Sequence, residues 1–464
     1  MSTLSIFDAA REAPNACALL EGARSVSFAE AADLARPLAA ALLAERPRAL
    51  ALAPRPDLAS VLWLYAAWAT ATPVLTLHAR SPEAERARLT ALAGASPAPA
   101  AAPHASFDPA ALPAPRPDEP LLFIPTSGST GTPRVVELSR QALFASARAS
   151  EQNLGWVPDD RWLLCLPLAH AGGLSIIWRT LLARKPAVLF DPGDAGALAR
   201  TGELLEHTRR ATLISLVPSL LQALLDAGLR GGGSLRAILL GGAACSPALA
   251  RRAHAAGLPL LTSYGLTETA SQVVTRRYAE RFDALPEQDG CVSSGHPLPG
   301  VVLELRDSGT IALAGPSLLS RYLDGSTALD ARGFLLTSDR GALGERGELY
   351  VRGRSDDVII TAGENVDPLE VEAALLELPG VEAACVFGTP STQFGQVVSA
   401  VIVTRHAELG QVETLARLLG SRLARHQLPR RALRAETLPL TASGKVDRRA
   451  CALRHTAALL HDPG

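Results

Sequence analysis

The chain has 464 residues, and at roughly 100 to 200 residues per domain this length predicts two to four structural units. Hydrophobic residues make up 48% and charged residues 20%, which excludes a largely disordered chain. The formal net charge of -1 gives no bulk electrostatic basis for binding nucleic acid or an anionic membrane, so neither is expected as a partner. The six cysteines form no CxxC pair, which argues against a disulfide framework or a zinc site and favours a reducing, cytoplasmic location.

The N-terminal region is predicted to contain neither a signal peptide nor a membrane span. Charged side chains such as Asp8 lie where a signal peptide needs its apolar core. The uncharged run 58–78 is long enough to cross a bilayer, but Pro73 interrupts it and hydroxyl side chains dilute it. We therefore expect a buried helix followed by a strand in this run.

The next part of the chain has the pattern of an α/β fold. Ser27 and Glu30 have the spacing of a helix-capping box, and leucines at four-residue steps follow. The Ala- and Pro-rich stretch 93–120 is predicted to be a surface linker. Strand-like runs then alternate with helical segments, which is typical of a largely parallel sheet. These runs are LLFIP, LLCLPL, AVLF, ATLISLV, RAILLGG and LPLLTSY.

After about residue 290 the pattern changes to short strands and turns. The last part of the chain is typical of a compact α+β unit, with helices expected at 368–378 and 412–425. A short charged turn at 354–357 separates two strand-like runs. We place a domain boundary there, which predicts domains at 1–355 and 356–464.

The segment Thr126-Ser-Gly-Ser-Thr-Gly-Thr-Pro-Arg134 combines small hydroxyl and glycine residues with a terminal cation. Such a segment lets backbone N–H groups and hydroxyls approach phosphate oxygens closely. It lacks the GK[ST] ending of a Walker A loop, and the following VVEL is typical of a strand, not a helix. These residues alone leave two interpretations open, a phosphate-binding loop and an ordinary Ser/Gly-rich turn.

Two carboxylates follow at positions suited to nucleotide binding. Glu268 comes shortly after the strand-like PLLT, where ligands of α/β sheets usually bind, and its hard oxygen atoms suit magnesium. Asp339 can accept both hydroxyl protons of a ribose, and Arg354 can add a donor. Taken singly, each residue is also compatible with a solvated loop or turn.

Lys445 is one of only two lysines among 45 basic residues, and it lies in the turn LPLTASGKVDR. A lysine in a glycine-containing turn is a mobile point charge that can reach a reacting oxyanion or phosphate. An exposed basic tail is the alternative, which the scarcity of lysine disfavours.

The order and spacing of these clusters resemble one superfamily, the acyl-adenylate-forming enzymes, which include acyl-CoA synthetases, adenylation domains of peptide synthetases and luciferases. The resemblance covers essentially the whole chain. It implies a large α/β N-terminal domain, in which mostly parallel sheets are layered with helices beside a β-rich subdomain, and a small α+β C-terminal domain on a hinge. The matching motifs are TSGSTGTPR, SYGLTETAS, LLTSDRG, RGRSDDVIITAGENVDPLEVE and LPLTASGKVDR.

The resemblance implies sites for ATP and Mg²⁺ at the matching positions. Glu268 would bind the magnesium ion, and Asp339 would hold the ribose hydroxyls with help from Arg354. The residues expected at the ATP phosphates are Thr126, Ser127, Gly128, Ser129, Thr130, Gly131 and Arg134. Those expected around the adenine are Gly242, Ala243, Ala244, Ser263, Tyr264, Gly265 and Thr267.

The resemblance also implies two half-reactions at one site. Lys445 would steady the acyl carboxylate and the α-phosphate during adenylation. The C-terminal domain would then rotate about Asp356, so that coenzyme A can enter beside Gly363 and form a thioester. The implied catalytic residues are Thr126, His170, Glu268 and Lys445.

Three positions depart from the superfamily pattern. Arg134 replaces the usual lysine of the phosphate loop, which the arginine-rich composition makes tolerable. Ser338 stands where a glycine usually precedes Asp339. Ala362 stands where a second glycine is common before Gly363, so this departure bears on the thiol channel.

The segment LPLAHAGGLSIIWRTLLA at 166–183 is the informative stretch for the acid. With LLGGAACSPAL and SYGLTETASQ it is similar to the o-succinylbenzoate–CoA ligases of menaquinone synthesis, although Ala169 replaces the usual bulky aromatic. Arg179 is a candidate for a second substrate carboxylate, with a helix-surface position as the alternative, and His170 alone is also compatible with a core histidine. The implied acyl pocket is formed by His170, Gly172, Gly173, Ser175, Gly241 and Gly265.

Three alternatives stay open at this point. An aryl- or fatty acyl-CoA ligase would share every catalytic motif. An amino-acid-adenylating enzyme that loads a carrier protein normally needs a pocket carboxylate, and the acids nearest to His170 in sequence are Asp160 and Asp191. A nucleotide-binding paralogue without activity is disfavoured by the intact motif residues. The expected partners are a small carboxylic acid, ATP and coenzyme A, and a homodimer is left open.

Overall fold

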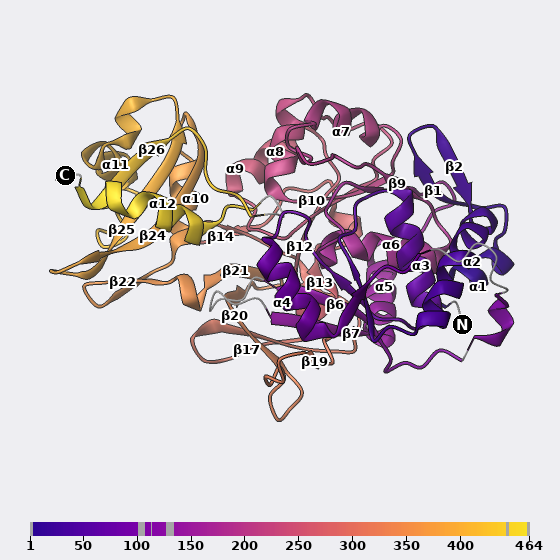
Figure 1. Ribbon diagram of the computed structural model, residues 1–464. Coiled ribbons are helices and arrows are strands. Elements are labelled where there is room, and N and C mark those ends of the chain that lie inside the picture. The colour runs from indigo at the N-terminus through magenta and orange to yellow at the C-terminus, as the bar shows by residue number, and fades with distance from the viewer. Residues whose placement is uncertain (1–2, 101–106, 113, 127–133, 442–444, 462–464) are drawn as a thin grey trace.

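The computed structural model describes residues 3–100, 107–112, 114–126, 134–441 and 445–461 (Figure 1). Two large sheets with their helices and a smaller antiparallel sheet make up the larger, N-terminal part. A five-stranded sheet makes up the smaller C-terminal part beside it. The predicted α/β fold with a large N-terminal and a small C-terminal domain is therefore confirmed.

A nine-stranded sheet forms the centre of the N-terminal domain, in the order β16-β13-β12-β11-β10-β8-β9-β1-β2. The six strands from β12 to β1 are parallel, so their carboxyl ends meet at one edge. Five of the predicted strand-like runs lie in this sheet, as the alternation with helices indicated. The strands are β1 (Cys17–Glu21), β2 (Arg24–Ser27), β8 (Trp162–Leu164), β9 (Ala187–Leu189), β10 (Leu213–Leu216), β11 (Ala237–Leu240), β12 (Leu260–Leu266), β13 (Ser271–Thr275) and β16 (His296–Pro297).

A six-stranded sheet packs beside it, in the order β19-β7-β6-β4-β3-β5. The run 58–78 forms a helix and a strand as predicted, and Asp57 caps the helix. The linker prediction for 93–120 is wrong at its start, because Ala95–Pro97 pairs with β3 as an edge strand, where a proline is tolerated. The elements are β3 (Ala49–Leu52), α3 (Leu58–Ala69), β4 (Val74–Thr76), β5 (Ala95–Pro97), β6 (Pro120–Thr126), β7 (Arg134–Ser139) and β19 (Arg321–Tyr322).

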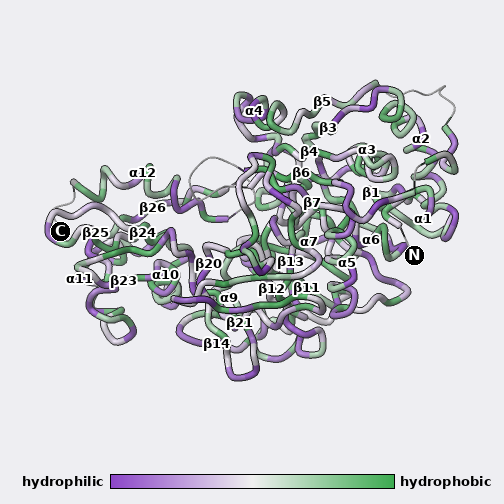
Figure 2. Tube along the Cα trace, turned by 90° about the horizontal axis from the view of Figure 1, so that it is seen from below, coloured by the Kyte–Doolittle hydropathy of each residue, from purple (hydrophilic) through white to green (hydrophobic). Residues whose placement is uncertain are grey.

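Helices cover these two sheets. The Ser27 hydroxyl accepts a hydrogen bond from the backbone N–H of Glu30 and caps α2 as predicted. Trp68, Trp162 and Trp178 are fully buried between helices and strands, and Figure 2 shows hydrophobic stretches along the inner strands. The helices are α1 (Ile6–Glu12), α2 (Phe28–Glu45), α4 (Glu83–Ala93), α5 (Arg140–Leu154), α6 (Ala171–Ala183), α7 (Thr201–Thr208), α8 (Pro218–Asp226) and α9 (Pro247–Ala255).

Short antiparallel strands follow after residue 286, in agreement with the predicted change of pattern. Four of them form the sheet β17-β18-β20-β21, and two form a hairpin. The last strand of the sheet, β21, ends where the charged turn begins. The strands are β14 (Glu287–Gln288), β15 (Cys291–Val292), β17 (Val302–Leu305), β18 (Thr310–Ala314), β20 (Leu335–Leu343) and β21 (Leu349–Arg354).

The C-terminal part has a hydrophobic core of its own, which includes Val371 and Ile402. Its first two α-helices begin at the predicted residues 368 and 412, but they end earlier than the predicted residues 378 and 425, at Leu376 and Leu419. The second one ends because Gly420 has a low helix propensity. The elements are β22 (Ile359–Thr361), β23 (Glu364–Val366), α10 (Pro368–Leu376), β24 (Val381–Ser391), β25 (Gly395–Thr404), α11 (Val412–Leu419), β26 (Arg431–Ala435) and α12 (Arg448–His461).

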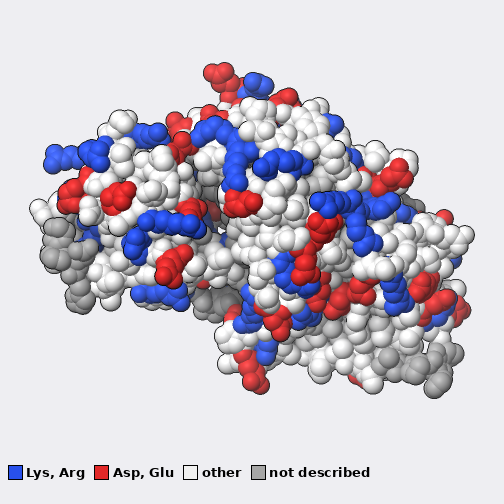
Figure 3. All heavy atoms as spheres, turned by 90° about the horizontal axis from the view of Figure 1, so that it is seen from above, with Lys and Arg blue, Asp and Glu red and all other residues white. Residues whose placement is uncertain are grey.

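The surface carries both signs of charge. Basic and acidic side chains are interspersed over the face seen in Figure 3, as the near-zero net charge predicts. No helix in the described part of the chain combines the length and apolarity needed to cross a membrane.

Candidate active site

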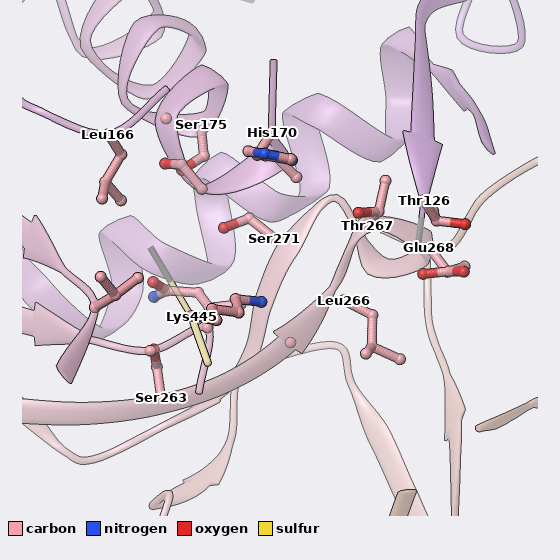
Figure 4. A pocket seen from close by; sticks show the side chains of 18 of the residues that line it. Thr126, Leu166, His170, Ser175, Ser263, Leu266, Thr267, Glu268, Ser271 and Lys445 are labelled. Atoms are coloured by element: carbon pink, nitrogen blue, oxygen red, sulfur yellow. The ribbon is translucent and has the colours of Figure 1, made fainter. Parts of the chain in front are cut away.

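A cavity of about 740 Å³ lies where the parallel strands of the central sheet end (Figure 4). Segments that directly follow the strands form its walls, because a parallel sheet brings its carboxyl ends to one edge. The segments that contribute are Leu166–Gly173 after β8, Val217 after β10, Gly241 and Gly242 after β11, and Thr267 and Glu268 after β12.

The amino end of α6 forms one wall of the cavity. Its N-cap residue, His170, makes no side-chain cap hydrogen bond. A Cβ atom at Gly173 would lie 2.4 Å from the carbonyl oxygen of Pro167, so only glycine permits this tight entry into the helix. Gly172 and Ser175 line the same wall. The first turn of α6 therefore lies directly against the cavity.

The imidazole of His170 is held neutral. Its Nε2 atom is buried without a hydrogen-bond partner, and the ring centroid lies 5.7 Å from that of His78. Burial, together with His78 and Lys445, lowers the pKa of His170 to about 4. At neutral pH this side chain is therefore a polar group without charge at the cavity wall.

Arg179 lies on the same helix, two turns further on, and lines the cavity. It is only 2% exposed, so the helix-surface interpretation is wrong. Its Nη1 and Nη2 atoms lie 3.4 Å from the Gln272 Oε1 and Ser146 Oγ atoms, and its Nε atom has no partner.

The Arg179 guanidinium also lies 5.7 Å from the ring centroid of Trp162. Burial lowers the pKa of Arg179 to about 9, and no acidic side chain of the described residues opposes this shift. A buried cation without an anionic partner is costly, so the site favours an anionic ligand.

Two partly buried carboxylates also line the cavity, from segments other than α6. The Glu268 Oε1 atom accepts a hydrogen bond of 3.0 Å from the Tyr322 hydroxyl, and burial raises the pKa of Glu268. The Asp339 Oδ2 atom accepts one of 2.7 Å from the Tyr264 hydroxyl, and burial raises the pKa of Asp339 as well. Arg354 lies 3.9 Å from the second Asp339 oxygen. Each carboxylate is thus oriented by a tyrosine and keeps an oxygen atom for a ligand.

Thr126 and Arg134 lie opposite each other on β6 and β7 and both line the cavity. The predicted phosphate residues Ser127, Gly128, Ser129, Thr130 and Gly131 lie outside the described residues. The Arg134 guanidinium lies 5.0 Å from the ring centroid of Tyr322 and 3.9 Å from the Asp324 carboxylate. This places a cation beside the tyrosine that holds Glu268.

Lys445 enters the cavity from the C-terminal domain (Figure 4). The backbone N–H of Thr441 donates to the Lys445 carbonyl over 2.7 Å, and Leu440 pairs with Val446 in an isolated bridge. Burial lowers the pKa of Lys445, and Asp339 opposes this shift.

Gly242 makes room for the lysine chain. A Cβ atom at Gly242 would lie 3.2 Å from the Lys445 Cε atom, and the residue has a φ of +80°, which favours glycine. The N-terminal domain thus has a recess shaped for a cation from the other domain.

Most predicted site residues meet at this cavity. Tyr264 does not line the cavity, but its hydroxyl donates a hydrogen bond to Asp339, which does. Those that line the cavity are Thr126, Arg134, His170, Gly172, Gly173, Ser175, Gly241, Gly242, Ser263, Gly265, Thr267, Glu268, Asp339, Arg354 and Lys445. Those that do not are Ala243, Ala244, Tyr264, Asp356 and Gly363.

Some lining residues were not predicted from the sequence. Ser271 and Gln272 lie at the start of β13, and only the antiparallel pairing of β13 with β12 brings them to the cavity. Tyr322 lies far along the chain on an edge strand of the other sheet. The one feature of the sequence that could have indicated Gln272 as a site residue was its position directly after the motif SYGLTETAS.

The turn between β22 and β23 lies outside the cavity and contains Gly363, which is exposed. Ala362 precedes it with a φ of +52°. This left-handed conformation costs a non-glycine residue about 1 kcal/mol. The alanine at position 362 therefore costs some folding free energy locally, and the chain still forms the turn between β22 and β23.

Comparison with known proteins identifies two matching regions. Residues 89–323 match the AMP-binding enzyme family, and residues 370–445 match the AMP-binding enzyme C-terminal domain. The 2-succinylbenzoate–CoA ligase of Listeria monocytogenes serotype 4b is 36% identical over 340 residues, which are 71% of this chain and 69% of that protein. The enzyme of the same name from Bacillus mycoides is 35% identical over 348 residues, 72% of this chain and 69% of that protein.

Solved structures are similar over nearly the whole chain. The o-succinylbenzoate CoA synthetase of Bacillus subtilis with its acyl-adenylate intermediate has a TM-score of 0.85, 26% identity and 97% coverage of both chains. The same enzyme with ATP and a magnesium ion has a TM-score of 0.83 and 26% identity, covering 96% of this chain and 98% of that one. ATP-bound MatB of Rhodopseudomonas palustris, at 23% identity and a TM-score of 0.84, covers 98% and 100% and shares the fold.

Replacement of Arg179 by methionine is expected to stabilise the ligand-free protein by about 1 to 4 kcal/mol, because an apolar side chain of similar length removes an unpaired buried charge. Urea denaturation of the free protein measures this. Arg148→Met, at a residue whose side chain is 60% exposed, serves as the control and should change stability by less than about 0.5 kcal/mol. A clear loss of stability in Arg179→Met would show that the contacts with Gln272 and Ser146 compensate the charge.

Proposed function

Because the chain belongs to the AMP-binding enzyme family, in which the 2-succinylbenzoate–CoA ligases are its relatives, we propose that it joins 2-succinylbenzoate to coenzyme A through an acyl-adenylate formed with ATP. Arg179 is the observation that carries the choice of acid. A dicarboxylic acid can present one carboxylate for activation and the other to this buried guanidinium. A fatty acid or simple benzoate would leave the cation unpaired.

The remaining alternatives fit the cavity less well. Glu268 and Asp339 are the only acidic residues among the described residues that line it, and neither belongs to α6, the helix that carries Arg179. An amino-acid-adenylating enzyme would need a carboxylate at its acyl pocket to bind the ammonium group of the substrate. The cavity of this chain has the cation Arg179 on α6 instead. A cation in that place would repel the ammonium group.

The chemistry requires two anions to meet. A carboxylate attacks the α-phosphorus of ATP, so cations must offset the repulsion and stabilise charge on the phosphoryl group. Lys445 would act between the acyl carboxylate and the α-phosphate, and Arg134 beside the outer phosphates. His170, neutral at pH 7, can contact the acid without adding charge. Thr126 supplies a hydroxyl at the end of β6.

The residues present also fit a magnesium ion. Glu268 keeps one oxygen free of the Tyr322 hydroxyl, and Thr267 precedes it in the cavity wall. No group of three or more metal-ligating side chains occurs among the described residues, which suits magnesium because this ion usually binds one or two carboxylates and substrate phosphates. Magnesium supplies charge neutralisation on the phosphates when it is bound.

The nucleoside would lie near Asp339. One oxygen of Asp339 is held by Tyr264, which leaves the other to accept the ribose hydroxyls, with Arg354 as an added donor. The loop after β11 and the start of the β12 motif would frame the adenine. The residues proposed there are Gly242, Ala243, Ala244, Ser263, Gly265 and Thr267.

The arrangement of the two domains suits adenylation. Lys445 lies in the cavity, and Gly363 lies outside it. Thioester formation would require residues 356–464 to rotate about Asp356, so that the lysine turn leaves and the Gly363 turn approaches. Coenzyme A could then reach the adenylate from the vacated side.

The function is tested by pyrophosphate release with ATP and Mg²⁺ across a panel of acids, with product analysis in the presence of coenzyme A. The panel contains 2-succinylbenzoate, benzoate, fatty acids and amino acids. We expect 2-succinylbenzoate to give a kcat/KM at least 100-fold above the monocarboxylic acids, together with a CoA thioester. Preference for a monocarboxylic acid would discard the assignment of the acid, and silence with every acid would discard the activity.

Replacement of Lys445 by alanine is expected to slow adenylation by 100-fold or more, since a charge stabilising the transition state is lost. Thioester formation from preformed acyl-adenylate should change less than threefold, because the lysine turn is then outside the cavity. Single-turnover measurement of each half-reaction distinguishes these effects, and Lys185→Ala, at a partly exposed lysine that does not line the cavity, is the control. Equal loss in both half-reactions would contradict this role.

Replacement of Arg179 by methionine is expected to raise the KM for 2-succinylbenzoate by 10-fold to 100-fold, because a charged hydrogen bond to the second carboxylate is lost. The KM for ATP should stay within twofold. A 2-succinylbenzoate monoester that lacks the free second carboxylate should respond little to the substitution. An unchanged KM for the dicarboxylic acid would show that Arg179 does not contact it.

A further inference from the structure

The residues on both sides of Asp356 are held by hydrogen bonds of their side chains. On the N-terminal side, the Arg354 Nη2 atom donates to the Ser338 hydroxyl over 2.5 Å, and the Ser355 hydroxyl donates to the Ser338 carbonyl over 3.0 Å. On the C-terminal side, the Arg448 Nη1 atom donates to the Asp357 carboxylate over 2.8 Å. Asp356 itself is exposed and has one ion-pair contact, of 3.6 Å, to Arg354.

Arg448 connects Asp357 with the body of the C-terminal domain. Its Nη2 atom donates to the Glu372 Oε1 atom on α10 over 2.7 Å, and its Nε atom donates to the Val386 carbonyl on β24 over 2.8 Å. The Val386 N–H in turn donates to the same Glu372 oxygen over 2.7 Å. One guanidinium thus joins three elements in a closed network, in which its planar geometry fixes the direction of each bond.

This network is well shielded from water. The side chains of Arg448 and Glu372 are 22% and 13% exposed. Burial raises the pKa of Glu372, and the charge of Arg448 opposes that shift. Charge-assisted hydrogen bonds of this kind are stronger than those on an open surface. The Asp357 end is therefore held firmly to α10 and β24.

The same arginine lies at the base of the turn that carries Lys445. Arg448 is the first residue of α12, three positions after the lysine. The backbone N–H of Asp447 donates to the Pro439 carbonyl over 2.8 Å and closes the turn. The Asp447 side chain accepts a hydrogen bond from Ala450 N–H over 2.9 Å. The direction of the lysine turn is thus set by how the start of α12 is anchored.

We propose that Arg448 is a positioning residue, which fixes Asp357 and the base of the Lys445 turn to one rigid body so that domain rotation is confined to Asp356. The inference rests on the proposed function, since it uses the hinge and the role of Lys445. Without the guanidinium, the rotation would spread over several residues and Lys445 would enter the cavity in many orientations. Adenylation would then suffer more than thioester formation, which does not use the lysine.

Four variants test this by measuring each half-reaction separately. We expect Arg448→Gln to slow adenylation at least 10-fold and thioester formation from preformed acyl-adenylate less than threefold. Asp357→Asn weakens only the contact beside the hinge, because the amide keeps an acceptor but loses the negative charge, so it should slow adenylation by threefold to 10-fold with the same asymmetry. Arg448→Lys should be intermediate, because lysine retains the charge but not the fork of donors. Arg449→Gln, at an exposed neighbour, should match the unsubstituted protein.

A second measurement reports on the hinge without activity. Limited proteolysis of the native protein should cleave near Asp356 at least fivefold faster in Arg448→Gln and Asp357→Asn, with thermal midpoints within 3 °C of the unsubstituted protein. If Arg448→Gln does not fold, Asp357→Asn decides the question by both measurements. Equal loss of both half-reactions in Asp357→Asn, or no loss and no change in cleavage, would overturn the inference. Failure of the unsubstituted protein to release pyrophosphate would instead overturn the proposed function.

Discussion

The repulsion between two anionic substrates is the constraint on which this structure depends. A carboxylate can approach a phosphate chain only where cations and oriented donors replace the lost water. The cavity meets this requirement by separating its charges. Arg179 lines the cavity from α6, Glu268 lines it just after β12, Asp339 lines it from β20, and Lys445 reaches it from the C-terminal part of the chain.

We propose that the division into two domains serves a cation that is needed for only one of the two steps. Lys445 lies partly buried in a recess that Gly242 leaves open, and this burial disfavours its charge while Asp339 supports it. Under the proposed mechanism, such a balance would let the lysine leave without large cost once the adenylate has formed. The proposed role of the network around Arg448 is to give this movement a defined pivot, since Arg448 bonds to Asp357 beside the hinge and to Glu372 on α10.

Much of the fold could be predicted because it depends on local patterns. The alternation of apolar runs with helical segments indicated the parallel sheet, and Ser27 marked the start of α2. The stretch 93–120 was misjudged because Ala95–Pro97 becomes a strand only by pairing with β3, which no local pattern encodes. The end of α11 came earlier than expected for a related reason, since periodicity alone does not weigh the glycine that stops it.

The sequence by itself determined the class of chemistry, because Glu268, Asp339 and Lys445 lie in short motifs whose residue types and order can be recognised without knowing the fold. Only the tertiary structure decided the state of Arg179. A helix-surface arginine and a buried one have the same sequence pattern, and the difference arises when α5 and β13 pack over α6 and exclude water from the guanidinium. Burial, charge pairing and the tyrosines behind the carboxylates depend on contacts between distant segments, so they become visible only in three dimensions.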